Sequence, residues 1–468
     1  MSGLMGSLQI ALGALQADQA GLSVTSNNIS NINTPGYARQ QVDLVENQPI
    51  QIGNLLFGDG VSVSQITSLR DGVLEQQIAN ETQEQSQSEA YLSPMEEAEA
   101  MFNDSSGTGL QSVISDFFNS FTQLSTDPSS TSLRQSVLTA AQNLADAFNQ
   151  SATSLTTIQS NLDEEVTADV GQVNNLTGQI AQLNTEIDQL PDATSGTDML
   201  IDERDYAVQQ LSALIGVQTS TSSNGDLNVS TANGIALVAG QQSFNLTTQT
   251  NATTGHQDVY GQGEDITSDL AGGALGGIIQ ARDQGIAGAL SQLNTLATAI
   301  ANQVNTVNQH GLYQAADGTV TQGGLFFNTP TTTNAAANMS VYMTDPSQIA
   351  CATGSVADFA TGDNSNALNL ADIQDQTIVD NETPIDYYSN FVSELGNEVS
   401  EASAESSSQS SVLTQLQQQL SSVSGVSLDE EAVNLIQFQN AYQAAARVIA
   451  TISTLTSTAV DLGNTGGS

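Results

Sequence analysis

Both ends of the chain carry apolar residues at alternating steps of three and four, the pattern of an amphipathic helix with a heptad repeat. The first stripe fills residues 1–32 over four heptads, with polar interruptions at Asp18 and Thr25. The second stripe runs from Leu435 to Ala459. Because such helices gain most of their stability from packing, we predict that the two ends pair as a coiled-coil-like layer. One ordinary helical hairpin closing a globular domain would produce the same pattern.

Helix boundary signals agree with these two stripes. Ser427 is a predicted N-cap, and Glu430 stands three residues later, at the position that completes a capping box. The first helix ends in "NNISNINTPGYARQ", where Pro35 and Gly36 suit the second and third positions of a type II turn. Asparagines are poor residues for a helix interior, but their side chains bond neighbouring backbone in turns.

Further helical periodicity lies between the ends. We expect helices at 74–102, 110–124, 131–150 and 155–190, with Pro191 ending the last of these. A helix in "DMLIDERDYAVQQLSALIG" should end at Gly216. Two more are expected at 277–309 and 385–420, the first entered through the glycine-rich stretch "AGGALGG".

Two stretches have the character of β structure. Residues 217–264 alternate β-branched runs with Asn-Gly pairs, which favour tight hairpin turns. Residues 311–384 are rich in Gly, Thr and Asn with short apolar pieces, and "QVDLVE" and "GVSVSQI" alternate just after the opening turn. The expected fold is mainly α with β-rich insertions. It is a long antiparallel helical rod built from both chain ends, with small β modules projecting outward.

This reading divides the chain into four parts. A terminal-helix assembly domain combines residues 1–60 with 428–468 as an inner layer. A helical rod domain combines 61–216, 265–310 and 385–427. Residues 217–264 form a small β-rich insertion, and 311–384 form a β-rich or irregular outer insertion.

The charge balance excludes several classes of partner. Fifty acidic residues face six arginines and no lysine, a formal net charge of −44. Such a surface repels nucleic acid and anionic lipid, so neither is an expected partner. No apolar run is long enough for a membrane span, and the N-terminus lacks the basic region of a cleavable signal peptide. The single cysteine, Cys351, is predicted to be a small buried apolar residue.

No motif indicates an active site. His256 and His310 stand outside any metal-binding or nucleophile motif and are predicted to be solvated surface residues. The segment "TGDNSNALNLADIQD" lacks the alternating oxygen ligands of a calcium loop. We therefore expect no enzyme activity, no catalytic residues, no cofactor and no metal.

Several segments together resemble one family. "NNISNINTPGYARQ" is similar to the N-terminal signature of bacterial flagellar axial proteins, and its Pro-Gly-Tyr extension resembles the flagellar hook-associated protein 1 family of hook–filament junction proteins. "MLIDERDYAVQQLSALIGV", "GGALGGIIQARD", "GDNSNALNLADIQ" and "SGVSLDEEAVNLIQFQNAYQAAARVIATI" resemble further landmarks of that family, in its order along the chain.

The resemblance implies a structural subunit of the flagellum, without cofactor, that is exported without a cleavable signal peptide and lies outside the cell. Its implied partners are hook subunits, the next hook-associated (distal junction) protein, further copies in a ring or helical layer, and an export chaperone on the C-terminal helix. Two alternatives stay open. One is another axial subunit of hook, rod or filament type, and the other is an acidic surface protein or adhesin.

We expect the assembly interface on both terminal helices and the opening turn. Arg39, one of few cations, is the residue there predicted to touch a neighbouring copy. The residues expected at this interface are Leu4, Leu8, Leu15, Leu22, Ile29, Ile32, Asn33, Pro35, Gly36, Tyr37, Arg39, Leu435, Phe438, Tyr442, Ile449 and Ile452.

Overall fold

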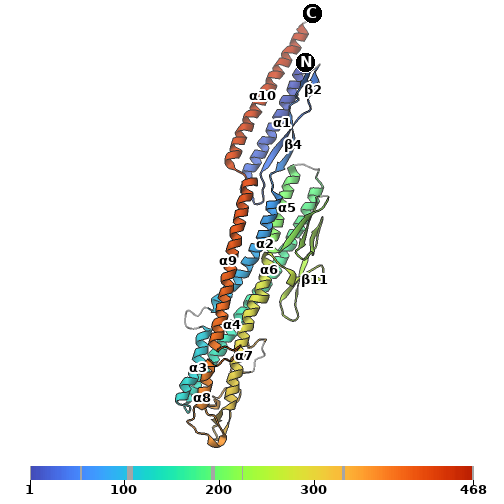
Figure 1. Ribbon diagram of the computed structural model, residues 1–468. Coiled ribbons are helices and arrows are strands. Elements are labelled where there is room, and N and C mark those ends of the chain that lie inside the picture. The colour runs from blue at the N-terminus through green and yellow to red at the C-terminus, as the bar shows by residue number, and fades with distance from the viewer. Residues whose placement is uncertain are drawn as a thin grey trace.

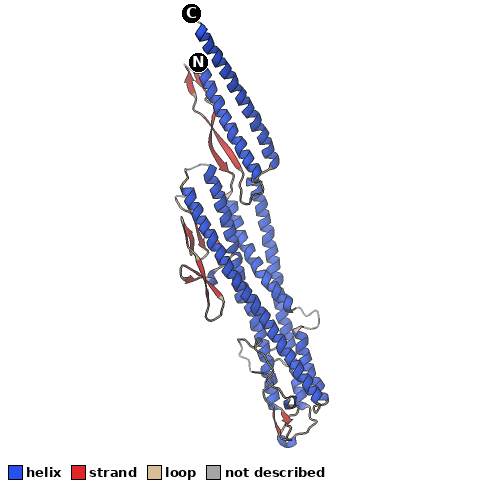
Figure 2. Ribbon diagram, turned by 180° about the vertical axis from the view of Figure 1, so that it is seen from behind, coloured by secondary structure: helices blue, strands red, loops and turns tan. Residues whose placement is uncertain are grey.

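The chain forms a long helical rod with a slimmer section at one end, where both termini lie (Figure 1). The computed structural model describes residues 2–52, 55–102, 109–190, 195–223, 225–328 and 333–465. Long helices make up most of the molecule, and the small antiparallel sheets stand beside or beyond them (Figure 2). This arrangement confirms the expected fold class.

The slimmer section, here called the terminal section, contains the two chain ends and a β-ribbon. Helix α1 (Ser2–Ser30) lies antiparallel to α10 (Leu428–Thr465), with the two termini at the same end (Figure 1). Strand β1 (Gln40–Glu46) pairs antiparallel with β4 (Val61–Ser68) through one register shift between Asp43 and Leu44. Strands β2 (Ile50–Ile52) and β3 (Leu55–Phe57) form the tip of this ribbon.

The rod is built from helices that follow the periodic segments. These are α2 (Gly72–Phe102), α3 (Leu110–Thr126), α4 (Thr131–Asp188), α5 (Ser195–Leu214) and α9 (Pro384–Ser424). The prediction of separate helices at 131–150 and 155–190 is wrong, because α4 is continuous over 58 residues. No glycine or proline interrupts it there, and Phe148, Ala152 and Leu155 continue one buried face. Pro191, the expected stop, lies outside the described residues.

The glycine-rich stretch is a packing site rather than a flexible entry. Helix α6 (Gly273–Gln280) already includes three of the four glycines, and it continues through a π-helical turn, η2 (Ala281–Ile286), into α7 (Ala287–His310). A Cβ atom on Gly277 would lie 2.2 Å from the backbone oxygen of Gln87 in α2. Glycine is needed because α2 and α6 approach at backbone distance.

Residues 217–265 form two small sheets on the side of the rod (Figure 2). The strands are β5 (Val217–Thr221), β6 (Leu227–Thr231), β7 (Ala236–Ala239), β8 (Gln242–Ser243), β9 (Leu246–Thr250), β10 (Gln257–Gly261) and β11 (Glu264–Asp265). Their orders are β5-β6-β7-β8 and β11-β10-β9. The predicted turns are present, with Gly225 at φ 92° and Gly234 at φ 89°. Asn224 lies outside the described residues.

Residues 311–384 close the end of the rod opposite the termini (Figure 1). They contain β12 (Leu312–Gln314), β13 (Val320–Gln322), α8 (Ser365–Ala371) and the short turns η3 (Pro346–Gln348), η4 (Val356–Asp358) and η5 (Asp372–Asp375). Phe326 and Phe327 are fully buried and pack on Phe117 and Phe121 of α3. Cys351 is buried here, as expected.

One contiguous apolar core extends through the rod. Its buried members begin at Met95 in α2 and end at Val399 in α9, and among the described residues it includes none from α1 or α10. Apolar burial is the main favourable term in folding, so the rod can be stable by itself. The terminal section must rely on a much smaller packed surface.

Candidate functional site: the terminal section and its joint to the rod

Small residues form the contact between α1 and its neighbours. Ala11 and Ala17 are buried, and Gly21 lies against the ring of Phe438 from α10. A Cβ atom on Gly21 would stand 2.5 Å from that ring, so only glycine allows this approach. On the other side, Gly13 faces the backbone oxygen of Val61 in β4. Helix α1 is therefore packed through a narrow strip of small side chains.

The leucine stripe of α1 lies on the flank of that strip. Leu4, Leu8, Leu15, Leu22 and Ile29 are all only half-buried. The stripe that pairs two helices should be the most buried part of each. The leucines are only half-buried, so in the single chain they form the edge of the α1–α10 contact and not its centre. The most buried residues of α1 are smaller ones, Ala11 and Thr25 within the stripe and Ala17 and Val24 outside it, and not the leucines.

The predicted stripe of α10 does face α1. Ile452 is buried, and four other predicted residues, Leu435, Phe438, Tyr442 and Ile449, are half-buried on a helix that is otherwise mostly exposed. The outer face of α10 nevertheless exposes apolar side chains, as do the start of α1 and the β-ribbon. These exposed residues are Met5, Leu12, Leu44, Val45, Leu56, Phe57, Val433, Ile436, Val448, Leu455 and Val460. Apolar surface gathered in this way marks a place for a partner.

The opening turn has the predicted type II form. The amide of Tyr37 donates to the carbonyl of Thr34 at 3.2 Å, and Gly36 has φ 76°. A Cβ atom on Gly36 would lie 2.7 Å from Tyr206 of α5, so the turn rests on the rod. Asn33 and Pro35 are exposed, and Ile32 is half-buried. The turn is thus both a helix end and a contact between the terminal section and the rod.

Asn28 connects α1 to the chain that follows the turn. It is 1% exposed, and its Oδ1 accepts from the Gln40 amide at 3.0 Å and from the Tyr37 hydroxyl at 2.8 Å. Its Nδ2 donates to the Gln40 carbonyl at 2.9 Å. Burial, with the nearby charges of Asp202 and Glu431, raises the pKa of Tyr37 to about 12, so its hydroxyl stays a donor. One asparagine of the signature therefore satisfies both the amide and the carbonyl of Gln40, the first residue of β1.

Arg39 is engaged within its own chain. Its Nε lies 2.8 Å from Glu431 and its Nη1 lies 2.9 Å from Glu430, both in the first turn of α10. Its amide donates to the Ser424 carbonyl at the end of α9. Glu430 thus pairs with Arg39, while its amide meets the Ser427 hydroxyl at only 3.5 Å. The contact of Arg39 with a neighbouring copy stays a prediction, and in the single chain it connects α9 and α10 to the opening turn.

Arg70 makes a second ionic connection at this joint. Its Nε lies 2.7 Å from Asp202 and its Nη2 lies 3.3 Å from Asp198, both on α5. Ser68, at the end of β4, donates to the same two carboxylates. Burial is the main reason that the pKa of Asp202 rises to about 6, although Arg70 opposes the shift. The start of the rod is therefore held to the ribbon by Ser68 and Arg70, which bind Asp198 and Asp202 of α5.

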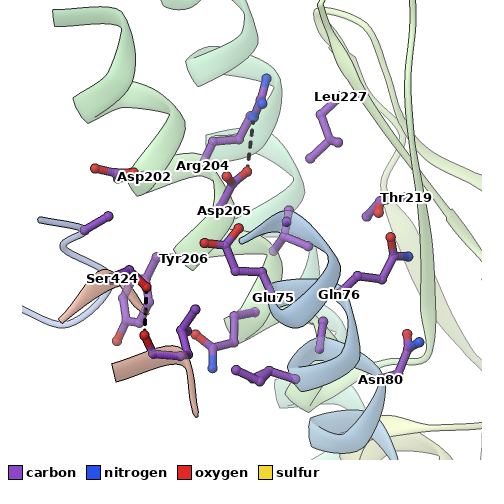
Figure 3. Close-up of a pocket in the computed structure, with 18 of the residues that line it drawn as sticks. Glu75, Gln76, Asn80, Asp202, Arg204, Asp205, Tyr206, Thr219, Leu227 and Ser424 are labelled. Carbon is purple, nitrogen blue, oxygen red and sulfur yellow. Dashed lines mark hydrogen bonds and ion pairs between the residues drawn. The ribbon is translucent and has the colours of Figure 1, made fainter. Parts of the chain in front are cut away.

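A cavity of about 430 Å³ lies beside these contacts. Figure 3 shows Glu75 from α2 and Asp202, Arg204 and Asp205 from α5 around it, with Ser424 from the end of α9. Burial raises the pKa of both Glu75 and Asp205. Among the described residues, no three His, Cys, Asp or Glu side chains are grouped so that they could hold a metal ion. The cavity is a gap at the joint, lined by these charged side chains and by apolar ones such as Ile78 and Leu227.

The sequence pointed to part of this joint only. It marked the opening turn and Arg39, but not Asn28, Arg70, Asp198 or Asp202. One available signal was composition, because an arginine in a chain with only six of them is expected to have a specific carboxylate partner.

Comparison with known proteins identifies the family. Residues 95–327 match the family model described as the flagellar hook-associated protein FlgK helical domain. The chain is 30% identical to flagellar hook-associated protein 1 of Bacillus subtilis, over 94% of this chain and 95% of that protein. The chain belongs to the flagellar hook-associated protein 1 family. The Escherichia coli member is 28% identical over 95% of this chain and 97% of its own length.

The fold is shared with a solved structure. A structure of the flagellar hook junction protein FlgK from Burkholderia pseudomallei matches with a TM-score of 0.68, covering 74% of this chain and all of that one, at 19% identity. At this identity the match shows the fold of the hook-associated protein 1 family and no more.

The two chain ends match broader models. Residues 8–37 match the model of flagella basal body rod proteins, and residues 417–462 match the C-terminal model of the basal body rod FlgEFG proteins. These two ranges contain most of α1, the opening turn, the end of α9 and most of α10. The joint is therefore the place where the general axial segments of this hook-associated protein meet its family-specific rod.

Proposed function

We propose that the chain is a structural subunit of the bacterial flagellum at the junction between hook and filament, and that it self-associates through α1 and α10 after export. The observation that supports this most is the composition of the terminal section. It exposes apolar side chains on two long helices, and the described residues of these helices contribute nothing to the main core. Such helices are stable in water only when other surfaces cover them.

The exposed apolar side chains of α10 would favour assembly. The outer face of α10 exposes Val433, Ile436, Val448 and Leu455 by 48–59%. Covering the exposed half of each side chain contributes roughly 1 kcal/mol. Every copy in a closed or helical layer gains this burial free energy at each contact with a neighbour. The gain offsets part of the entropy lost on association. The half-buried leucines of α1 add a second surface of the same kind.

Partners and location follow from the same proposal. We infer contacts to hook subunits, to the next hook-associated protein and to further copies in a ring or helical layer, with an export chaperone on α10 before assembly. The site of action is the extracellular flagellum. No helix in the described part of the chain is both long and apolar enough to cross a membrane.

The alternatives receive less support. The chain ends match models of rod proteins, but residues 95–327 match the hook-associated helical domain, so the middle of the chain separates this family from other axial subunits. A role without catalysis agrees with a structural family and with a joint whose carboxylates are engaged by arginines.

A paired substitution tests the proposal. Ile436→Asp places a charge on the outer face of α10, and Val412→Asp places one at a 44% exposed position of α9 in the rod. We expect Ile436→Asp to prevent retention of the chain on flagella, because the charge would be buried in the layer. Val412→Asp should be retained like the unchanged protein. Equal retention of both variants, each folded by circular dichroism, would contradict self-association through α10.

A further inference from the structure

The two terminal helices carry almost no charge along their length. Helix α1 has one charged residue, Asp18. Helix α10 has three acids in its first turn, and from there to residue 460 its one charged residue is Arg447. In a chain with a net charge of −44, these two helices are unusually poor in charge. The single charge of α1 is negative, and the single charge in the body of α10 is positive.

Neither charge has a partner among the residues that the structure describes. Asp18 and Arg447 form no ion pair within 4.0 Å and no side-chain hydrogen bond in that part of the chain. The other five arginines all bond carboxylates or carbonyls of their own chain. Arg447 therefore stands apart from every other cation of the molecule.

Each charge lies on an apolar face that is still uncovered. Asp18 belongs to the half-buried stripe of α1, three residues from Leu15 and four from Leu22. Arg447 is exposed on the outer face of α10, beside Val448 and along the line of Ile436. Covering these faces removes water from both charges, and a charge that loses water is tolerated when it gains an opposite one.

We propose that Asp18 of one copy pairs with Arg447 of a neighbouring copy, so that the α1 flank of each subunit docks on the outer face of the next subunit's α10. This pairing rests on the proposed self-association, and it adds the register and the direction of the contact between copies. The two surfaces differ, so the contact is heterologous and continues from copy to copy into a ring or a helix. The single opposite charge in each surface fixes which residues meet.

The geometry of one subunit also indicates an axial offset. Gly21 lies opposite Phe438, so Asp18 is level with residue 441 of the antiparallel α10. Arg447 is six residues further along, which at 1.5 Å per residue is about 9 Å. A direct contact therefore requires the second copy to be shifted along the axis by up to about 9 Å. The shift is smaller where the extended arginine side chain covers part of that distance. Successive copies shifted in this way build a helical layer.

Charge reversal tests the pair. Asp18→Arg and Arg447→Asp are introduced singly and together into the full chain, in cells that make flagella with it. The amount of chain retained on isolated flagella is compared with the amount released into the medium. Each single variant places like charges opposite each other and should lower retention about tenfold, and the double variant should restore it. A double variant no better than the singles, or singles that are retained normally, overturns the pair.

The same assay keeps this inference separate from the proposed function. If Ile436→Asp abolishes retention while both charge reversals leave it unchanged, self-association through α10 stands and the Asp18–Arg447 pair is wrong. If Ile436→Asp is also retained normally, the proposed self-association through α10 is wrong as well.

Cross-linking gives a direct readout. Flagella are assembled from a mixture of Asp18→Cys chains and Arg447→Cys chains and treated with a short bismaleimide. Cross-linked dimers of the two chains are expected, since the reacting residues lie on different copies. A mixture of Asp18→Cys and Val412→Cys chains is the control and should give none. Cys351 is buried and does not react in the folded chain. Absence of the dimer in the first mixture contradicts the contact.

Discussion

Arginine side chains join segments of the rod that lie far apart in the sequence. Arg134 of α4 donates to three carbonyls of the far end, those of Pro346, Ser347 and Ile349. Arg204 of α5 donates to Asn184 of α4. Arg282 is 1% exposed in the π-helical turn and pairs with Asp163 of α4 at 2.8 Å. In a chain without lysine, each of these cations has a definite structural partner.

Arg282 also orders the β module. It donates to the Gln257 carbonyl in β10, and Asp163 in turn accepts from the Gln257 amide at 2.9 Å. His256 lies 2.9 Å from the other oxygen of Asp163. The prediction of solvated histidines is therefore wrong for His256, because its ring lies against a carboxylate from a helix 93 residues away in sequence. These hydrogen bonds and Arg282 hold the pKa of Asp163 below its usual value, although burial acts in the opposite direction.

Replacing Arg282 should strongly destabilise the rod. Arg282→Gln leaves Asp163 and Asp283 without their buried cation, which costs on the order of 3 kcal/mol in the free energy of unfolding. Arg447→Gln is the matched control and should change the stability of the single chain by no more than about 0.5 kcal/mol. Urea unfolding of both purified variants measures the difference. A cost below about 1 kcal/mol for Arg282→Gln would show that the buried pair is not needed.

Among the secondary structure elements, sequence patterns predicted where the long helices lie better than where each helix begins, ends or continues. The periodic segments gave α2, α3, α5 and α9, because each carries apolar side chains that the core buries. The continuity of α4 was missed because neither hydrophobic periodicity nor helix propensity shows whether two adjacent periodic segments form one helix or two. The role of the glycines in α6 was missed because close backbone contact depends on α2, nearly 200 residues earlier.

Replacing a glycine by alanine should change the unfolding free energy in opposite directions in α6 and α4. Gly277→Ala places a methyl group 2.2 Å from the Gln87 backbone oxygen, so α2 and α6 must separate. We expect a loss of about 1–3 kcal/mol in unfolding free energy. Gly178→Ala in α4 meets no atom within 4 Å and should raise stability by about 0.5–1 kcal/mol through helix propensity. Thermal unfolding compares the two, and equal effects would mean that Gly277 is not a packing residue.

The pairing of the terminal helices was predictable at the level of elements but not of contacts. Heptad spacing placed Leu435, Phe438, Tyr442, Ile449 and Ile452 on the side of α10 that faces α1. The same spacing did not show that Gly21 and Ala17 bring the helices together, because small residues add little to an apolar pattern. Nor could it show Asn28 bonded to Gln40 or Arg70 bonded to α5, since both depend on how the chain turns in space.

The whole molecule combines a packed rod with an incompletely covered terminal section. The core of the rod contains large buried side chains such as Phe117, Phe148 and Phe327. The terminal section has few buried apolar residues, among them Ala11, Ala17, Val24, Ala445 and Ile452. Local stability follows the density of buried contacts, so the two parts should open at very different free energies. The joint at Arg39 and Arg70 holds the ends in place without giving them a core.

Amide hydrogen exchange of the single chain and of assembled flagella tests this account most directly. In the single chain, we expect residues 2–30 and 432–460 to exchange much faster than 137–180 of α4, because their helices lack a core. In assembled flagella, both terminal segments should become as protected as α4. Strong protection of both segments already in the single chain, or no gain on assembly, would contradict the claim that neighbouring copies complete their packing.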